Sequence, residues 1–146
     1  MKKLILVGIL GAALAAVGTP AARVSAQAMD KAMALGTIHL AKAVMVDGTR
    51  LSAGTYQLRL TMDHPKPATG ESPESEQFVE ILKGTTVVAR DVATVVSKAD
   101  IGAIAKGETP PAAGSAKVEM LKGDDYIRVW VNKDGTHYLL HFQVAA

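Results

Sequence analysis

Apolar and polar side chains alternate along the stretch Tyr56-Gln57-Leu58-Arg59-Leu60-Thr61-Met62. Because successive side chains of a β-strand point to opposite faces, this period of two is typical of a strand that is buried on one side. The buried face is expected to carry Tyr56, Leu58, Leu60 and Met62, and the exposed face Gln57, Arg59 and Thr61.

Strand patterns continue on both sides of this stretch. They cover residues 37–46, 78–82, 86–96, 117–121, 126–132 and 136–144. Turn residues separate them, such as Asp47-Gly48 and Lys83-Gly84, and the 86–96 stretch is rich in β-branched residues. About seven short strands favour an all-β chain, either an antiparallel sandwich or a partly open barrel. We predict a single antiparallel β-sandwich over residues 29–146.

Helical patterns are short in this part of the chain. Residues 30–35 and 98–105 could each form one or two helical turns over an end of the sheet. Residues 63–77 contain three prolines and three glutamates, so they predict a loop that is disordered or, alternatively, functional. Residues 107–116 contain Pro110-Pro111 and predict an extended surface connection.

The final hairpin has two possible registers. A type I turn followed by a glycine bulge at Gly135 would pair Trp130 with Tyr138. A two-residue Asp134-Gly135 turn would instead pair Val131 with Tyr138. We favour the bulged turn, because it gathers the bulk of Trp130, Tyr138 and Phe142, although it also brings Arg128 onto that face.

A short motif overlaps the first strand pattern. Residues 51–60 contain L-x-x-G-x-Y-x-L, formed by Leu51, Gly54, Tyr56 and Leu58. This motif resembles the strand entry of prealbumin-like and carboxypeptidase-regulatory-like modules, and of secreted bacterial proteins of that kind. The resemblance implies a sandwich and carries over no functional residue, because such modules share a scaffold rather than a site.

The N-terminus has the pattern of a secretory signal peptide. Lys2 and Lys3 precede an apolar run over residues 4–17, and small residues end in Ala26-Gln27-Ala28. The run is shorter than the roughly 20 residues of a membrane-spanning helix. We predict a signal peptide over residues 1–28, with cleavage after Ala28 and cleavage after Ala26 as the alternative. The mature protein, starting at Met29, is expected in the periplasm or outside the cell, without a membrane span.

Composition excludes several classes of protein. Removal of residues 1–28 leaves 13 basic and 14 acidic residues, a net charge of −1, which gives no electrostatic case for nucleic-acid binding. The chain has no cysteine, so it forms no disulfide and carries no lipid on a cysteine.

Four histidines are candidate metal ligands: His39, His64, His137 and His141. His137 and His141 lie on one predicted strand, where four residues span roughly 13 Å, too far for a shared ion. Asp124-Asp125 and Asp134 lie at opposite ends of another strand, so turn chemistry accounts for them better than calcium. We expect no metal and no cofactor.

No motif predicts catalysis. The chain has no G-x-S-x-G sequence and no cysteine nucleophile, and no two carboxylates have a spacing that indicates an acid–base pair. We therefore expect that the protein is not an enzyme and has no catalytic residue. Tyr126, Trp130, Tyr138 and Phe142 could form a stacking platform for a flat ligand, but a place in the core is the better expectation. The function expected is a secreted module that binds an envelope or extracellular protein or glycan. The alternatives are a self-assembling surface subunit and a small sugar- or metal-binding domain.

Overall fold

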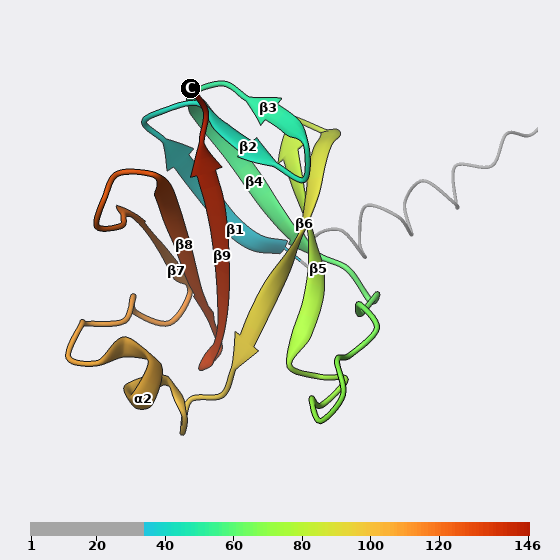
Figure 1. The fold of residues 1–146 in the computed structure, drawn as a ribbon, viewed down its shortest axis with the longest axis vertical. Helices are drawn as coiled ribbons and strands as arrows, with labels where there is room; N and C mark the ends of the chain where they lie inside the picture. Colours follow the sequence, from blue (N-terminus) through green and yellow to red (C-terminus); the bar gives the residue numbers. More distant parts are fainter. Residues whose placement is uncertain (1–33) are drawn as a thin grey trace, which may run out of the picture.

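Nine antiparallel strands and one short helix make up the computed structural model, which describes residues 34–146. The signal-peptide prediction and the predicted start at Met29 lie outside these residues. The strands are β1 Ala34–Leu40, β2 Val44–Val46, β3 Thr49–Leu51, β4 Gly54–Leu60, β5 Glu76–Lys83, β6 Thr86–Val96, β7 Ser115–Met120, β8 Tyr126–Lys133 and β9 Thr136–Val144. The helix, α2, covers Ile101–Ala105 and lies at one end of the strands (Figure 1).

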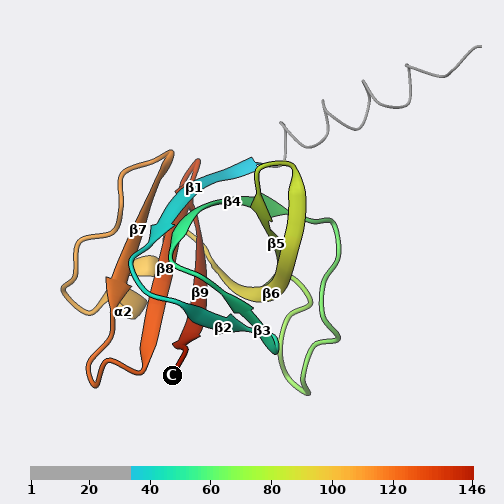
Figure 2. The same ribbon diagram turned by 90° about the horizontal axis from the view of Figure 1, so that it is seen from above.

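The strands form a single sheet that nearly closes into a barrel. Its order is β1-β4-β5-β6-β9-β2-β3, and β8 pairs with the other edge of β9 and with β7. Seen from above, the strands run round a ring in which β7 returns to the side of β1 (Figure 2). Among the described residues, no hydrogen-bonded ladder joins β1 to β7, so this seam is where the barrel stays open.

The all-β, antiparallel prediction is confirmed, whereas a two-layer sandwich is not. The long strand β6 explains the difference. Thr86–Thr94 of this strand pair with β5, and Thr94–Val96 pair with β9. Because one continuous strand pairs with both β5 and β9, the two parts of the sheet are joined into a single curved sheet.

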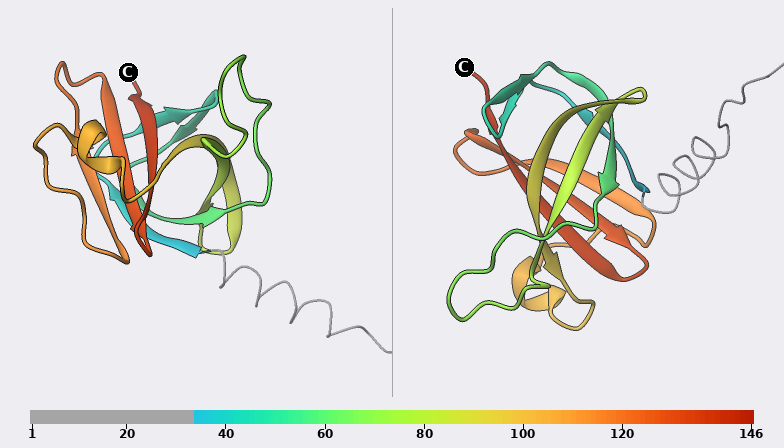
Figure 3. Two further views of the ribbon diagram at one scale, coloured as in Figure 1. Left: turned by 90° about the horizontal axis from the view of Figure 1, so that it is seen from below. Right: turned by 90° about the vertical axis from the view of Figure 1, so that its right-hand side faces the viewer.

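Most of the core fills the inside of this barrel. Its largest fully buried side chains on the inner face include Phe142, Leu58, Ile81, Leu140 and Val129. A second, smaller cluster lies on the outer face of β8 and β9, where Trp130 and Leu139 pack against Ile101 and Ala105 of α2 and against Val96. Figure 3 shows α2 outside the sheet next to these strands.

The strand pattern over residues 56–62 is confirmed over most of its length. Tyr56 and Leu58 are buried and Gln57 is exposed, as the alternation predicts. The prediction is wrong at the end, where Met62 is 77% exposed and Thr61 is buried. The strand ends at Leu60, and the Thr61 hydroxyl donates to the Phe78 carbonyl at 2.9 Å, so the alternation stops there.

The preferred register of the last hairpin is wrong. Val131 pairs with Tyr138 and Trp130 with Leu139, as the two-residue turn requires. Asp134 and Gly135 both have positive φ, 53° and 92°, which is the type I′ geometry of tight hairpins. As a result, Trp130 faces outward with Arg128, while Tyr138 and Phe142 face the barrel interior.

Three smaller expectations have different outcomes. The 37–46 pattern is split into β1 and β2 by a bend at Ala41 and Lys42. Of the 30–35 helix, Ala34 and Leu35 belong to β1, and residues 30–33 lie outside the described part. The 98–105 helix is confirmed as the single turn Ile101–Ala105.

Within residues 34–146, no helix has the length and apolar character needed to cross a membrane.

Candidate functional site

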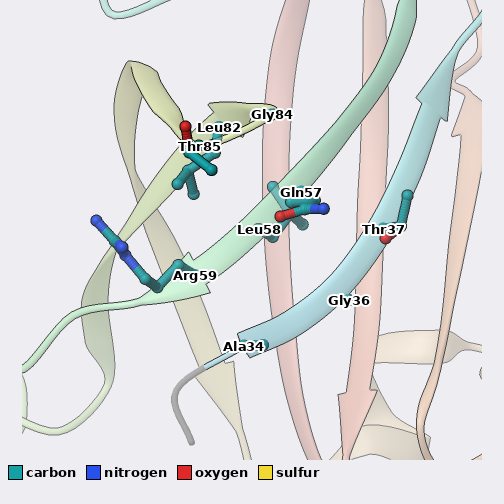
Figure 4. Close-up of a pocket in the computed structure, with 9 residues that line it drawn as sticks. All are labelled: Ala34, Gly36, Thr37, Gln57, Leu58, Arg59, Leu82, Gly84 and Thr85. Carbon is teal, nitrogen blue, oxygen red and sulfur yellow. The ribbon is translucent and has the colours of Figure 1, made fainter. Parts of the chain in front are cut away.

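The described surface has a groove on β1, β4 and the β5–β6 turn. We call it the β1–β4 groove; it has a volume of about 400 Å³ and is lined by Ala34, Gly36, Thr37, Gln57, Leu58, Arg59, Leu82, Gly84 and Thr85. Figure 4 shows Thr37 and Gln57 on the neighbouring strands β1 and β4, with Leu82 of β5 and Gly84 and Thr85 of the β5–β6 turn across from them.

Backbone irregularities shape this groove. In β1, the pairing with β4 shifts between Ala34 and Gly36, so two residues on β1 oppose one on β4. Such a bulge bends a strand and redirects its side chains. Gly36 has φ 137° and Gly84 has φ 65°, and a Cβ built at either would meet no atom within 4 Å. The glycines therefore leave backbone accessible at two sides of the groove.

The polar groups of the groove are uncharged, apart from one arginine. Thr37 and Gln57 are exposed cross-strand partners, and Thr85 adds a second hydroxyl. Arg59 extends away from Thr37 (Figure 4) and forms an ion pair with Glu80 of β5 at 3.1 Å. The groove can donate and accept hydrogen bonds, but none of its side chains is a general acid, a general base or an activated nucleophile.

The four histidines lie in separate surroundings. His39 contacts the Thr55 hydroxyl at 3.2 Å, and His64 contacts the Glu76 carbonyl at 2.7 Å. His137 is buried against Trp130, whereas His141 is exposed opposite Arg128 on β8. Over residues 34–146, no three His, Cys, Asp or Glu side chains come together as a metal-binding group.

The predicted aromatic platform is divided between the two faces of the sheet. Tyr138 and Phe142 are in the barrel interior, Tyr126 is 45% exposed, and Trp130 is completely covered on the outer face. Asp124 and Asp134 both have positive φ in turns at opposite ends of β8, so the turn explanation for them fits the structure.

Sequence reasoning missed both the groove and the Trp130–His137 pair. Gln57 had been placed on the exposed face, but nothing in the sequence indicated that Thr37 and Thr85 would lie near it. The Trp130–His137 pair could have been found from the Asp-Gly turn alone, because the two-residue register puts both side chains on the outer face.

Comparison with protein-family models, curated proteins and solved structures finds no match to this chain. No ligand, activity or site residue is therefore carried over from another protein. The resemblance of residues 51–60 to prealbumin-like modules stays a prediction.

Proposed function

We propose that this protein is a secreted, non-enzymatic binding module, and that it takes a partner at the cell envelope in the β1–β4 groove. The observation that carries the proposal is the groove itself, an open hollow of about 400 Å³ with Thr37, Gln57 and Thr85 around accessible backbone. These groups recognise a ligand by hydrogen bonds and offer no chemistry to transform it.

The partner expected is a polypeptide segment rather than a sugar. Sugar-binding sites commonly stack the flat face of the ring on an aromatic side chain, and no residue lining the groove is aromatic. Backbone amides and carbonyls of an extended segment match the hydroxyls of Thr37 and Thr85 and the amide of Gln57, each of which can donate and accept.

Binding of the purified secreted protein to isolated cell envelopes tests this proposal. We expect saturable co-sedimentation of the wild-type protein, and a loss of affinity of at least about tenfold, or about 1.4 kcal/mol, for Gln57→Arg. The long charged side chain would occupy the groove, and a substitution at this exposed position is expected to leave the fold intact.

Gln143→Arg is the matched control, because Gln143 is also an exposed glutamine on an outer strand face and lies outside the groove. This variant should bind like the wild type. Equal loss in both variants, or no saturable binding of the wild type, would contradict the proposal.

A further inference from the structure

Residues 97–114 form a cap over the outer face of β8 and β9. Ile101 and Ala105 of α2 pack on Trp130, which has no exposed surface. The polar contacts include two to Asn132, whose side chain donates to the Pro111 carbonyl at 2.9 Å and whose carbonyl accepts from the Gly114 amide at 2.7 Å. Arg128 also forms an ion pair with Glu108. The cap is thus held by two apolar side chains of one helical turn and by a few polar contacts near the surface.

A buried histidine is bonded to the tryptophan under this cap. The Trp130 Nε1–H donates to His137 Nδ1 at 2.8 Å, and His137 is only 3% exposed. Because Nδ1 accepts this hydrogen bond, the neutral ring must carry its proton on Nε2. A second proton can bind only at Nδ1, so protonation of His137 necessarily breaks its bond to Trp130.

Three basic and three acidic side chains lie around His137 and Trp130. Lys98 of the cap and Asp134 of the β8–β9 turn line the same hollow as His137. Lys117 of β7 and Arg128 of β8 lie over the Trp130 ring, at 5.9 and 5.2 Å from its centroid. The residues of α2, Ile101–Ala105, and the neighbouring Val96 of β6 are uncharged. Asp134 is the acidic side chain that lines this hollow. Glu108 and Glu119 pair with Arg128, and Glu119 also pairs with Lys117.

Burial lowers the pKa of His137 from its ordinary value of 6.5. A state in which the ring is hydrated regains the ordinary pKa and therefore binds the proton more tightly than the capped state. The stability that the capped state owes to neutral His137 is fully present above about pH 6.5. It is lost as the pH falls from there towards the lowered pKa.

We propose that the cap is an acid-sensitive cover: protonation of His137 releases residues 97–114 from the sheet and uncovers Trp130, while the barrel stays folded. The two sets of contacts are separate, since the interior core lies on the opposite face of the sheet from Trp130 and His137. A segment with few apolar contacts can open at a free energy well below that of global unfolding.

Trp130 is the only tryptophan of the chain, so its fluorescence reports on the cap directly. We expect acrylamide quenching of Trp130 to rise several-fold between about pH 7.5 and pH 4.5, with a midpoint below 6.5, while far-UV circular dichroism is retained. In His137→Gln, which cannot titrate, the acid-induced rise should disappear. His141→Gln is the control, because His141 is an exposed histidine on the same face of β9, and it should behave like the wild type.

Hydrogen exchange of the wild-type protein gives a second readout that does not depend on a variant folding. After correction for intrinsic rates, protection of residues 97–114 should fall at the lower pH, while the β5–β6 hairpin keeps its protection. Unchanged quenching down to pH 4.5, the same transition in His137→Gln, or simultaneous loss of protection in the cap and the hairpin would overturn the proposal.

Discussion

Tyr56 is held by contacts at both ends of its side chain. The ring lies in the barrel core at 2% exposure, and its hydroxyl donates to the Ser52 carbonyl at 2.7 Å. This bond to a carbonyl four residues upstream is the arrangement known as a tyrosine corner. It fixes the turn at Gly54, whose φ of 153° a residue with a side chain rarely adopts.

Truncation of this side chain should therefore cost far more than truncation of its neighbour. We expect Tyr56→Ala to lower the free energy of unfolding by roughly 3 kcal/mol or more, as aromatic-to-alanine changes in cores do. Gln57→Ala, on the exposed face, should cost less than about 1 kcal/mol. Denaturant melts of the two variants make the comparison, and equal losses would mean that both faces of β4 are buried.

Individual residues show where the sequence pattern stops being informative. Alternation predicts Tyr56, Gln57 and Leu58 correctly because β4 is regular there. It fails at Thr61 and Met62, because the strand has ended and the Thr61 hydroxyl is satisfied by the Phe78 carbonyl. That contact joins residues 17 apart, and no local pattern reports it.

Among the elements, the hairpins were the easiest to predict and their registers the hardest. The β5–β6 hairpin forms as expected, although its turn is Gly84-Thr85 rather than Lys83-Gly84. In the β8–β9 hairpin the choice between turns was made on aromatic bulk. The observed register instead follows from the turn, in which Asp134 and Gly135 both have positive φ. This type I′ turn matches the twist of the strands.

The β4–β5 connection has anchored ends and a weakly held middle. Near its ends, the Phe78 amide donates to the Asp63 carbonyl at 3.0 Å, and Asp63 pairs with Arg90 at 2.7 Å. Between residues 65 and 74 the backbone makes only local turn contacts, such as Glu71 to Ala68. Figure 1 shows this segment as a long excursion from the sheet.

Limited digestion should therefore begin in this connection. We expect proteinase K to make its first cut between residues 63 and 77, because exposed polar loops are the preferred sites of proteolysis. The two fragments should stay associated through β4 and β5, which are paired. Mass spectrometry of the early products locates the cut, and a first cut within β6 would contradict the strand assignment.

At the scale of the whole molecule, the closed shape of the sheet depends on long-range contacts that no local sequence pattern predicts. Strand content and antiparallel pairing follow from the alternation and the turn residues. Closure of the sheet depends on β6 continuing from its pairing with β5 into its pairing with β9. The β1–β4 groove follows from a bulge and from the approach of a distant turn, so it could only be found in three dimensions.

We propose the β1–β4 groove as the binding surface of the barrel, and site-specific photocrosslinking tests that proposal most directly. A photoreactive amino acid would be placed at position 57 in the groove or at position 143 on another exposed strand face, in cells that produce the protein. We predict a discrete crosslinked adduct to an envelope protein from position 57 and none from position 143. No adduct from position 57, the same adduct from both positions, or an adduct of twice the chain's own mass would contradict it.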